Sequence, residues 1–415
     1  MTTRAADRHA HGTSQPAPTG ATRTRRRRWP WVLLAMAVAL VTLFYVGGGW
    51  YFSTAIHNDV FAVSPGIPAT TQTGTLDEVS PSAADQGTVT MTLDEKSANP
   101  DRYANATVGI AVGESLIVAG PVVSADGPTV TRPVLDLVGD VPAPGSPAGV
   151  NRDVWTSPDQ LDLPYTDVAL TSEGVQYPAW VIPGTSTTWA VLVHGKGGYP
   201  AEMLRMATTL HERDISCLLI SYVNDPGVPR APEGMYGYGT LEVPQVEAAV
   251  GYALGEGAER IILGGVSHGA AISLGFLATS DMAATVDAVI LDSPPADLAG
   301  NVDAIGDTRS LPVVGLPIPE SLETVALKMT ELRFGLDFDD YDWTATAERI
   351  TAPTLIYQGG EDRTVAASIP RELAAAMGST ATLVEQPEAQ HVGSWNVDPE
   401  AYATAMTGFL DGAGL

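Results

Sequence analysis

The chain has 415 residues, of which 45% are hydrophobic and 17% charged, a composition typical of a compact globular protein rather than a disordered one. Its length exceeds the roughly 250 to 300 residues at which a single core stops growing, so we expect two folded parts and a targeting segment. The net charge is −26, but seven of the 22 basic residues precede Trp29, which leaves 15 basic against 47 acidic residues after them. A surface this acidic repels phosphate groups and argues against nucleic-acid binding.

An apolar segment near the N-terminus is long enough to cross a membrane. Residues 31–52 contain no charged side chain, and at about 1.5 Å per residue a helix of that length spans a hydrocarbon core of roughly 30 Å. Tryptophan and tyrosine stand at both ends, where aromatic rings settle at the lipid–water interfaces. We therefore expect a transmembrane signal anchor at residues 29–52.

The basic residues before this segment predict its orientation. Residues 25–28 are all arginine, and the positive-inside rule keeps such a block in the cytoplasm. Residues 1–28 are then a cytoplasmic basic tail, and the rest of a single-pass cell-membrane protein is extracytoplasmic. A cleaved signal peptide is the alternative, because Ser53, Thr54 and Ala55 are small, but the apolar run is longer than the about 7 to 15 residues usual for a cleaved signal.

Residues 53–158 contain short β-branched runs separated by Gly, Pro, Asn and Asp. This pattern predicts a small β-rich extracytoplasmic region of five or six strands. Proline and glycine cluster at residues 142–149, which favours a linker or a surface loop before the next unit. No catalytic pattern is visible in this region, and we interpret it as a spacer or packing lid in preference to an independent binding module.

Residues 159–415 alternate between apolar runs of strand length and stretches of helical length. This alternation predicts an α/β fold with a mostly parallel central sheet covered by helices. Two extended pieces, at 166–171 and 177–182, precede the series and suit an antiparallel edge hairpin. The predicted strands are 189–193, 217–221, 260–263, 288–291, 354–357 and 382–385, and the predicted helices are 201–213, 243–254, 270–278, 366–377 and 399–410.

The strongest local signal is the pentapeptide Gly265-Val266-Ser267-His268-Gly269, which fits G-x-S-x-G. It lies directly after a predicted strand and directly before a predicted helix, the setting in which this pattern carries a nucleophilic serine. Glycines two residues to either side would prevent collisions with the neighbouring strand and helix at so sharp a turn. The alternative is a glycine-rich turn with an ordinary exposed serine.

With this motif, the stretch from about 161 to 415 resembles the α/β-hydrolase superfamily, and residues 221–227 are similar to membrane-anchored actinobacterial serine hydrolases. The resemblance implies a catalytic triad in the chain order serine, acid, histidine. Only His268 and His391 follow Ser267. A residue next to the nucleophile points into the helix, so His391 is the expected base.

The resemblance also implies the other site residues. Asp362 matches the family's acid in the pattern that starts at Gly359, with Glu361 and Asp292 as competitors. The backbone N–H groups of Lys196 and His268 are the expected oxyanion donors. The alternative for Lys196 is an exposed side chain without a role, and His194 is expected to hold its loop rather than to catalyse.

An insertion at about 297–349 occupies the place where the family carries a cap. We expect a carboxylic-ester hydrolase that acts on a small-molecule acyl substrate without a cofactor or metal. A serine aminopeptidase-like peptidase is the alternative; it needs a site for the substrate N-terminus, for which Asp337, Asp339 and Asp340 are candidates. A second alternative is a non-catalytic cell-envelope protein that retains the fold.

Overall fold

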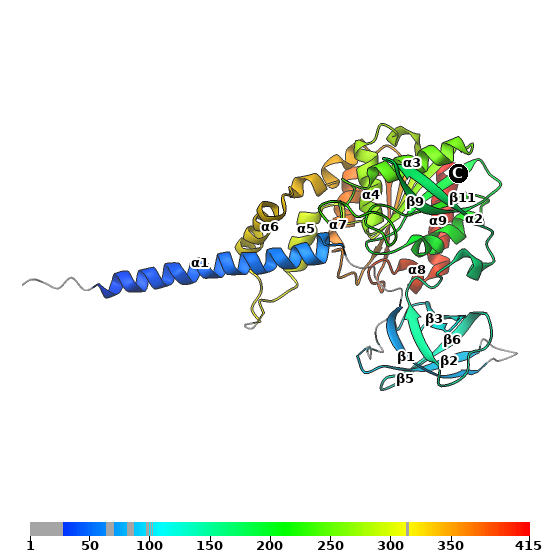
Figure 1. Ribbon diagram of the computed structural model, residues 1–415, viewed down its shortest axis with the longest axis horizontal. Helices are drawn as coiled ribbons and strands as arrows, with labels where there is room; N and C mark the ends of the chain where they lie inside the picture. The colour runs from blue at the N-terminus through cyan, green and yellow to red at the C-terminus, as the bar shows by residue number, and fades with distance from the viewer. Residues whose placement is uncertain are drawn as a thin grey trace, which may run out of the picture. The chain divides into compact units, whose positions relative to one another are not determined.

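The computed structural model describes residues 28–63, 70–80, 87–96, 99, 101, 103–312 and 315–415. Within the predicted cytoplasmic tail, residues 1–27 lie outside the described part of the chain. The chain divides into two compact units, Met1–Gly47 and Gly48–Leu415. Figure 1 labels the elements.

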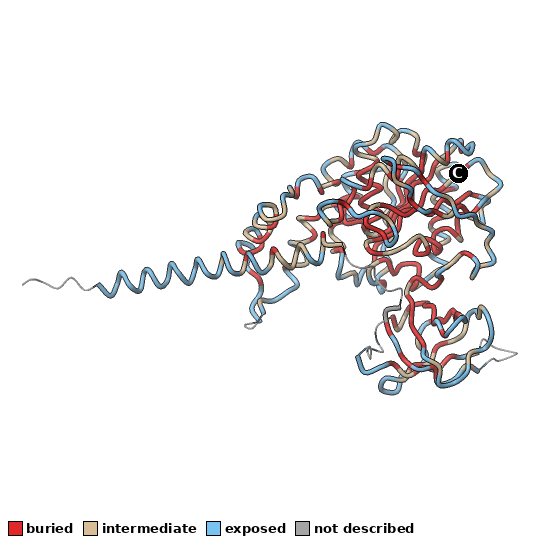
Figure 2. The backbone as a smooth tube through the Cα atoms, viewed as in Figure 1, coloured by how far each residue is buried: buried red, intermediate tan, exposed pale blue. Residues whose placement is uncertain are grey.

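Helix α1 (Trp29–Ile56) is long and apolar enough to cross a membrane by length and composition. Its side chains up to Gly47 are almost all exposed, as Figure 2 shows in pale blue, so no protein core explains their apolar character. This helix is compatible with a single-pass anchor. It continues beyond residue 52, where we expected it to end, and a π-helical turn (His57–Phe61) follows it.

Residues 48–61, which we call the docked segment, pack within the second unit, and their contacts account for the longer helix. Arg333 of helix α6 (Glu320–Phe334) donates hydrogen bonds to the Trp50 carbonyl and to the hydroxyls of Ser53 and Thr54. Phe61 is fully buried in a hydrophobic cluster that also contains residues from one face of the central sheet, such as Val191 and Leu263. The predicted division between an anchor ending at 52 and a β-rich region starting at 53 therefore falls inside one continuous helix.

Two glycines allow the docked segment to approach helix α6 closely. A Cβ added at Gly48 would lie 3.0 Å from a methyl group of Leu322, and one added at Gly49 would lie 2.7 Å from a methyl group of Val325. A Cβ at either position would require the methyl groups of Leu322 or Val325 to shift, so glycine is what permits this close approach.

The β-rich region forms a sheet of seven described strands, more than the five or six expected, in the order β2-β1-β7-β3-β4-β6-β5. Pairing of β2 with β6 joins the two sides of the sheet around a small apolar core that includes Leu76, Met91 and Ile110. The strands are β1 (Thr70–Ser80), β2 (Thr88–Leu93), β3 (Val108–Val112), β4 (Ser115–Ala119), β5 (Ser124–Asp126), β6 (Thr129–Val138) and β7 (Pro147–Asn151).

The linker expected at 142–149 is only partly a loop. Strand β7 begins at Pro147 and pairs with both β1 and β3. Proline is tolerated there because it is the first residue of the strand. The Pro and Gly cluster marked a turn correctly, but it did not mark the end of the region.

The second sheet has eight described strands in the order β15-β14-β13-β12-β10-β11-β9-β8. Strands β10 to β15 are parallel, and β8 and β9 form the antiparallel hairpin at one edge. The predicted α/β-hydrolase architecture, with its edge hairpin, is confirmed. The strands are β8 (Thr166–Ser172), β9 (Val175–Ile182), β10 (Thr188–Val193), β11 (Ser216–Ile220), β12 (Arg260–Val266), β13 (Val286–Asp292), β14 (Thr354–Gly359) and β15 (Ala381–Gln386).

Helices cover both faces of this sheet because the strands are apolar on both sides. Alternate residues of β10 belong to two different clusters: Val191 shares one with residues of helices α3, α4 and α7, whereas Leu192 shares the other with residues of α2 and α9. Figure 2 shows these strands as the buried centre of the unit. The helices are α2 (Leu204–His211), α3 (Val243–Gly255), α4 (His268–Thr279), α7 (Ser368–Met377), α8 (Ser394–Val397) and α9 (Pro399–Ala413).

The insertion expected at 297–349 leaves the sheet after β13 and returns to it at β14. It contains helix α5 (Leu298–Gly306), helix α6, and short 3-10 turns at Phe338–Tyr341 and Thr344–Arg349. Leu322 and Ala326 of α6 are buried, so the apolar stripe of this helix faces protein.

Candidate active site

Ser267 occupies the sharp turn between strand β12 and helix α4. Its backbone has φ of 49° and ψ of −118°, a conformation that an L-residue adopts only when its surroundings enforce it. A Cβ at Gly265 would lie 2.3 Å from the Gly269 carbonyl oxygen, and one at Gly269 would lie 2.1 Å from the Val193 carbonyl oxygen. Both glycines of the motif are therefore required by close backbone contacts, as the sequence pattern suggested.

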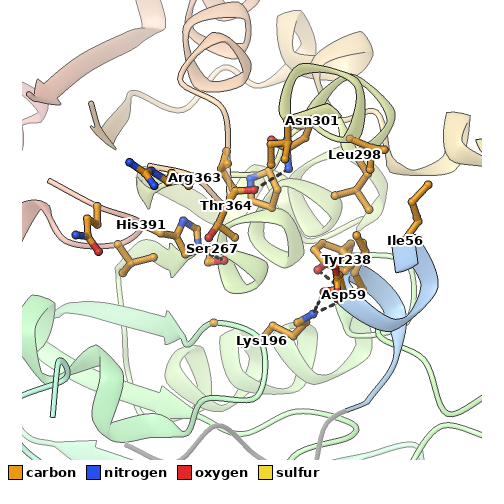
Figure 3. Close-up of a pocket in the computed structure, with 18 of the residues that line it drawn as sticks. Ile56, Asp59, Lys196, Tyr238, Ser267, Leu298, Asn301, Arg363, Thr364 and His391 are labelled. Carbon is orange, nitrogen blue, oxygen red and sulfur yellow. Dashed lines mark hydrogen bonds between the residues drawn. The ribbon is translucent and has the colours of Figure 1, made fainter. Parts of the chain in front are cut away.

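Two loops bring an imidazole and a carboxylate to this serine. His391 follows strand β15, and its Nε2 lies 2.8 Å from Ser267 Oγ. Its Nδ1 lies 2.8 Å from the Oδ2 of Asp362, which follows strand β14. The His391 side chain is 17% exposed and the Asp362 side chain fully buried. Figure 3 shows Ser267 and His391 facing each other in the pocket. The three residues thus have the geometry of a hydroxyl, a base and an orienting acid.

The electrostatics of Asp362 favour its charged form. Burial acts to raise the pKa of Asp362, but the charge and hydrogen bond of His391 outweigh burial, as do the N–H groups of Val365 and Thr364, and the pKa is lowered. Those two N–H groups donate to Oδ1 at 2.9 and 2.8 Å. A negative charge is therefore held where it fixes the tautomer of His391.

The two competing acids lie elsewhere. Glu361 is exposed. Asp292 is buried at the end of β13, where it accepts a hydrogen bond from the Ser293 hydroxyl at 3.0 Å, and burial raises its pKa to about 6. The His391 Nδ1 contact is with Asp362 and not with either of them.

The two other histidines near the serine are turned away from it. The fully buried ring of His268 lies 3.1 Å from the Tyr222 hydroxyl and 3.4 Å from the Glu242 carboxylate. His194 lies 2.9 Å from Asp225 through Nε2 and 2.9 Å from the Gly195 carbonyl oxygen through Nδ1. Both rings hold backbone in place, which agrees with the structural role expected of His194.

The loop after β10 places Gly195 and Lys196 beside the serine. A Cβ at Gly195 would lie 3.5 Å from Ser267 Cβ, and its N–H donates to Glu202 Oε2 at 2.8 Å. The backbone N–H groups of Lys196 and His268 have no acceptor among the residues that the structure describes, so both are available to a ligand.

The Lys196 side chain is not free in solvent, which was the alternative considered for it. It is partly buried, and Nζ donates to the carbonyl oxygens of Asp59 and Val60 in the docked segment. Burial lowers its pKa, against an opposing effect of Asp59. Figure 3 shows the side chain pointing toward Asp59. The loop that carries one expected oxyanion donor is thus tied to residues next to the N-terminal helix.

A cluster of charged side chains that the sequence did not reveal connects the loop that carries Gly195 to the loop that carries His391. Arg152, which follows β7 of the β-rich region, donates to the His391 carbonyl oxygen at 3.2 Å and to Glu202 Oε1 at 3.0 Å. Arg205 donates to the Val392 carbonyl oxygen at 3.1 Å. Glu202 also accepts a hydrogen bond from the Gly195 N–H. This buried carboxylate therefore links the loop after β10, through Arg152, to the loop that carries His391. No local pattern marks these residues, since their partners are far away in sequence.

A pocket of about 660 Å³ opens at Ser267, within the 300 to 1,000 Å³ usual for small-molecule sites. Helices α5 and α6 of the insertion contribute to its wall, so this insertion lies where a cap is expected. The acidic run considered for a peptidase does not line the pocket: the Asp337 side chain accepts from the Asp339 N–H, and Asp339 and Asp340 are exposed.

Comparison with known proteins agrees with this fold. The family model described as "Alpha/beta hydrolase family" matches residues 190–405, more than half of the chain, and the chain belongs to this family. No curated protein matches it.

Solved structures with a similar fold include three bacterial or archaeal proteins. The esterase Pf2001 of Pyrococcus furiosus is 21% identical, with 62% of this chain and 95% of that chain covered and a TM-score of 0.49. Est1E of Butyrivibrio proteoclasticus, solved with ferulic acid, is 17% identical, with 59% and 98% covered and a TM-score of 0.43. A hydrolase from Pseudomonas aeruginosa is 20% identical, with 59% and 98% covered and a TM-score of 0.43.

Proposed function

We propose that this alpha/beta hydrolase is a membrane-anchored extracytoplasmic serine hydrolase that transfers an acyl group to water and acts on carboxylic esters. The observation that carries the proposal is the continuous relay at the pocket: Ser267 Oγ to His391 Nε2 at 2.8 Å, and His391 Nδ1 to Asp362 Oδ2 at 2.8 Å.

In the first half-reaction His391 takes the proton of Ser267 as its oxygen attacks the ester carbonyl carbon. The carbonyl oxygen gains the negative charge and accepts hydrogen bonds from the backbone N–H groups of Lys196 and His268, whose loss typically costs about a hundred- to a thousandfold in rate per donor. His391 then protonates the departing alcohol. In the second half-reaction a water, deprotonated by His391, attacks the acyl-serine; the acyl–oxygen bond breaks, His391 returns the proton to Ser267 Oγ, and the carboxylic acid leaves. Asp362 stays ionised throughout.

Membrane anchoring is supported by the apolar helix α1 and by the burial of Phe61. Cleavage at residues 53–55 would cut helix α1 within the docked segment, which favours a retained anchor over a cleaved signal peptide. The arginine block at 25–28 favours a cytoplasmic N-terminus.

Labelling with a fluorophosphonate probe tests the nucleophile. We expect the detergent-solubilised protein to be labelled, Ser267→Ala to lose the label, and His391→Ala to lose turnover while remaining folded. Labelling that persists in Ser267→Ala would contradict the assignment. Hydrolysis of small esters without hydrolysis of aminoacyl arylamides would separate the esterase from the peptidase alternative, and absence of both would favour a non-catalytic role.

A further inference from the structure

The docked segment contributes a wall of the pocket that contains Ser267. Phe52, Ala55 and Ile56 from the last turns of α1 line the pocket, together with Asp59 and Val60. In Figure 3 Ile56 lies on the side of the pocket away from His391. A helix that would otherwise serve only as an anchor therefore supplies part of the surface that a substrate touches.

The wall opposite the catalytic residues is mostly apolar. Leu298, Val302 and Ile305 of α5 and Ala326 of α6 line the pocket with the apolar residues of the docked segment. Three charged side chains also line this part: Glu323 of α6 is buried, whereas Asp59 and Arg309 are exposed, with 4.0 Å between their charged groups, and mark the rim. An apolar wall favours an apolar occupant, because water in contact with it is easily displaced.

The docked segment is held firmly enough to shape a binding site. Phe61 packs edge-on against Tyr238 at 6.0 Å between ring centroids, and the Tyr238 hydroxyl donates to the Val60 carbonyl oxygen at 3.1 Å. His57 stacks on Phe334 of α6 at 3.9 Å. These contacts hold the segment against the core through Tyr238 and against the cap through Phe334, so the position of this wall is fixed.

We propose that the docked segment and helices α5 and α6 form an acyl-chain subsite, in which the substrate's hydrocarbon chain lies against Phe52, Ala55 and Ile56. The inference rests on the proposed esterase function and specifies its substrate class: esters of medium or long unbranched fatty acids rather than acetyl esters. The pocket is much larger than an acetyl group requires, and each further methylene that it buries raises kcat/KM about fourfold.

A series of p-nitrophenyl esters from acetate to decanoate tests this subsite on the full-length protein in detergent. We expect kcat/KM to rise with chain length. Ala55→Trp fills part of the pocket and is expected to lower the octanoate-to-acetate ratio of kcat/KM about fifteenfold, the effect of losing roughly two buried methylenes. Tyr51→Trp is the matched control, because Tyr51 lies on the same helix, is exposed and does not line the pocket; it should leave the whole profile unchanged.

Phe52→Ala provides a second variant that adds no bulk. It should lower the octanoate-to-acetate ratio of kcat/KM through lost contact with the longer chain. A flat chain-length profile, or variants that change both esters equally, would overturn the subsite. If acetate is hydrolysed and Ser267 is labelled while the ratio does not move, only this inference fails; if Ser267 is not labelled and no ester is hydrolysed, the proposed function fails with it.

Discussion

At the scale of single residues, Asp362 has surroundings unlike those of a surface carboxylate, because it is fully buried and bonded to both His391 and two backbone N–H groups. Asp362→Asn keeps its shape but presents an amide N–H to His391, so that His391 must hold its proton on the nitrogen that faces Ser267. We expect kcat for an ester to fall by about a thousand- to ten-thousandfold, measured by steady-state kinetics. Glu361→Gln, next to it but exposed, is the control and should retain activity. A kcat of Asp362→Asn close to that of the unchanged protein would remove Asp362 from the triad.

Asp292 is a second buried carboxylate, and its effect is on stability. Burial raises its pKa from 3.8 to about 6. The folded state therefore holds a proton that the unfolded state releases, so this contribution to stability is fully present below about pH 4 and is lost as the pH rises through about 6. At about 1.4 kcal/mol per pKa unit, the loss amounts to about 3 kcal/mol.

Asp292→Asn lacks this loss, so its free energy of unfolding should rise relative to the unchanged protein between about pH 4 and 6. Urea titrations across that range measure it, and a constant difference would contradict the prediction.

At the scale of elements, the turn from β12 to α4 depends on the absence of side chains. In Gly269→Ala the new methyl carbon would lie 2.1 Å from the Val193 carbonyl oxygen and 2.5 Å from the His194 carbonyl oxygen, so backbone must move. We expect a loss of about 1 to 3 kcal/mol in the free energy of unfolding, typical of overpacking, and a large loss of labelling at Ser267, since the turn holds the nucleophile. Gly251→Ala in helix α3 meets nothing within 4 Å and should gain about 0.5 to 1 kcal/mol. Equal melting temperatures for the two variants would show that the contact at Gly269 is not restrictive.

The elements that the sequence predicted well are those with a local pattern. Each expected strand of the central sheet is present within a few residues, because short apolar runs alternate with helical stretches, and the motif around Ser267 stands at a strand-to-helix turn. His391 could be selected because only two histidines follow Ser267, and Asp362 because it matches the family's pattern that starts at Gly359. Strand β7 was missed because Pro147 and Gly149 belong to a composition typical of loops, whereas pairing with β1 and β3 determines their conformation.

At the scale of the whole chain, long-range contacts could not be predicted. Arg152 reaches the His391 carbonyl oxygen across 239 residues of sequence, and Arg333 reaches the Trp50 carbonyl oxygen across 283. Neither pair has a periodic signal, and a charged residue in so acidic a sequence is expected at the surface. The β-rich region, interpreted from sequence as a spacer or lid, contacts the His391 carbonyl oxygen and the Glu202 carboxylate through Arg152. We therefore infer that it contributes to the geometry of the site.

The docked segment gives the last prediction, since it joins the N-terminal helix to the core. A chain that begins at Gly48 keeps Phe61 and the carbonyl groups that Lys196 and Arg333 bind, whereas a chain that begins at residue 64 loses all of them. Removing a buried phenylalanine side chain typically costs about 3 to 5 kcal/mol, so the shorter chain should unfold at a clearly lower urea concentration. It should also label more slowly with a fluorophosphonate probe, because the loop that carries Lys196 is no longer held.

Phe61→Ala in the full-length protein separates the two effects, because it keeps the backbone carbonyls of Asp59 and Val60 in the chain. We expect this variant to lose stability to a similar extent but to retain more of the labelling rate than the chain that begins at residue 64. Equal urea midpoints and equal labelling rates in all three proteins would mean that residues 48–63 are only a tether, and that the contacts of Lys196 and Tyr238 with them have no influence on Ser267.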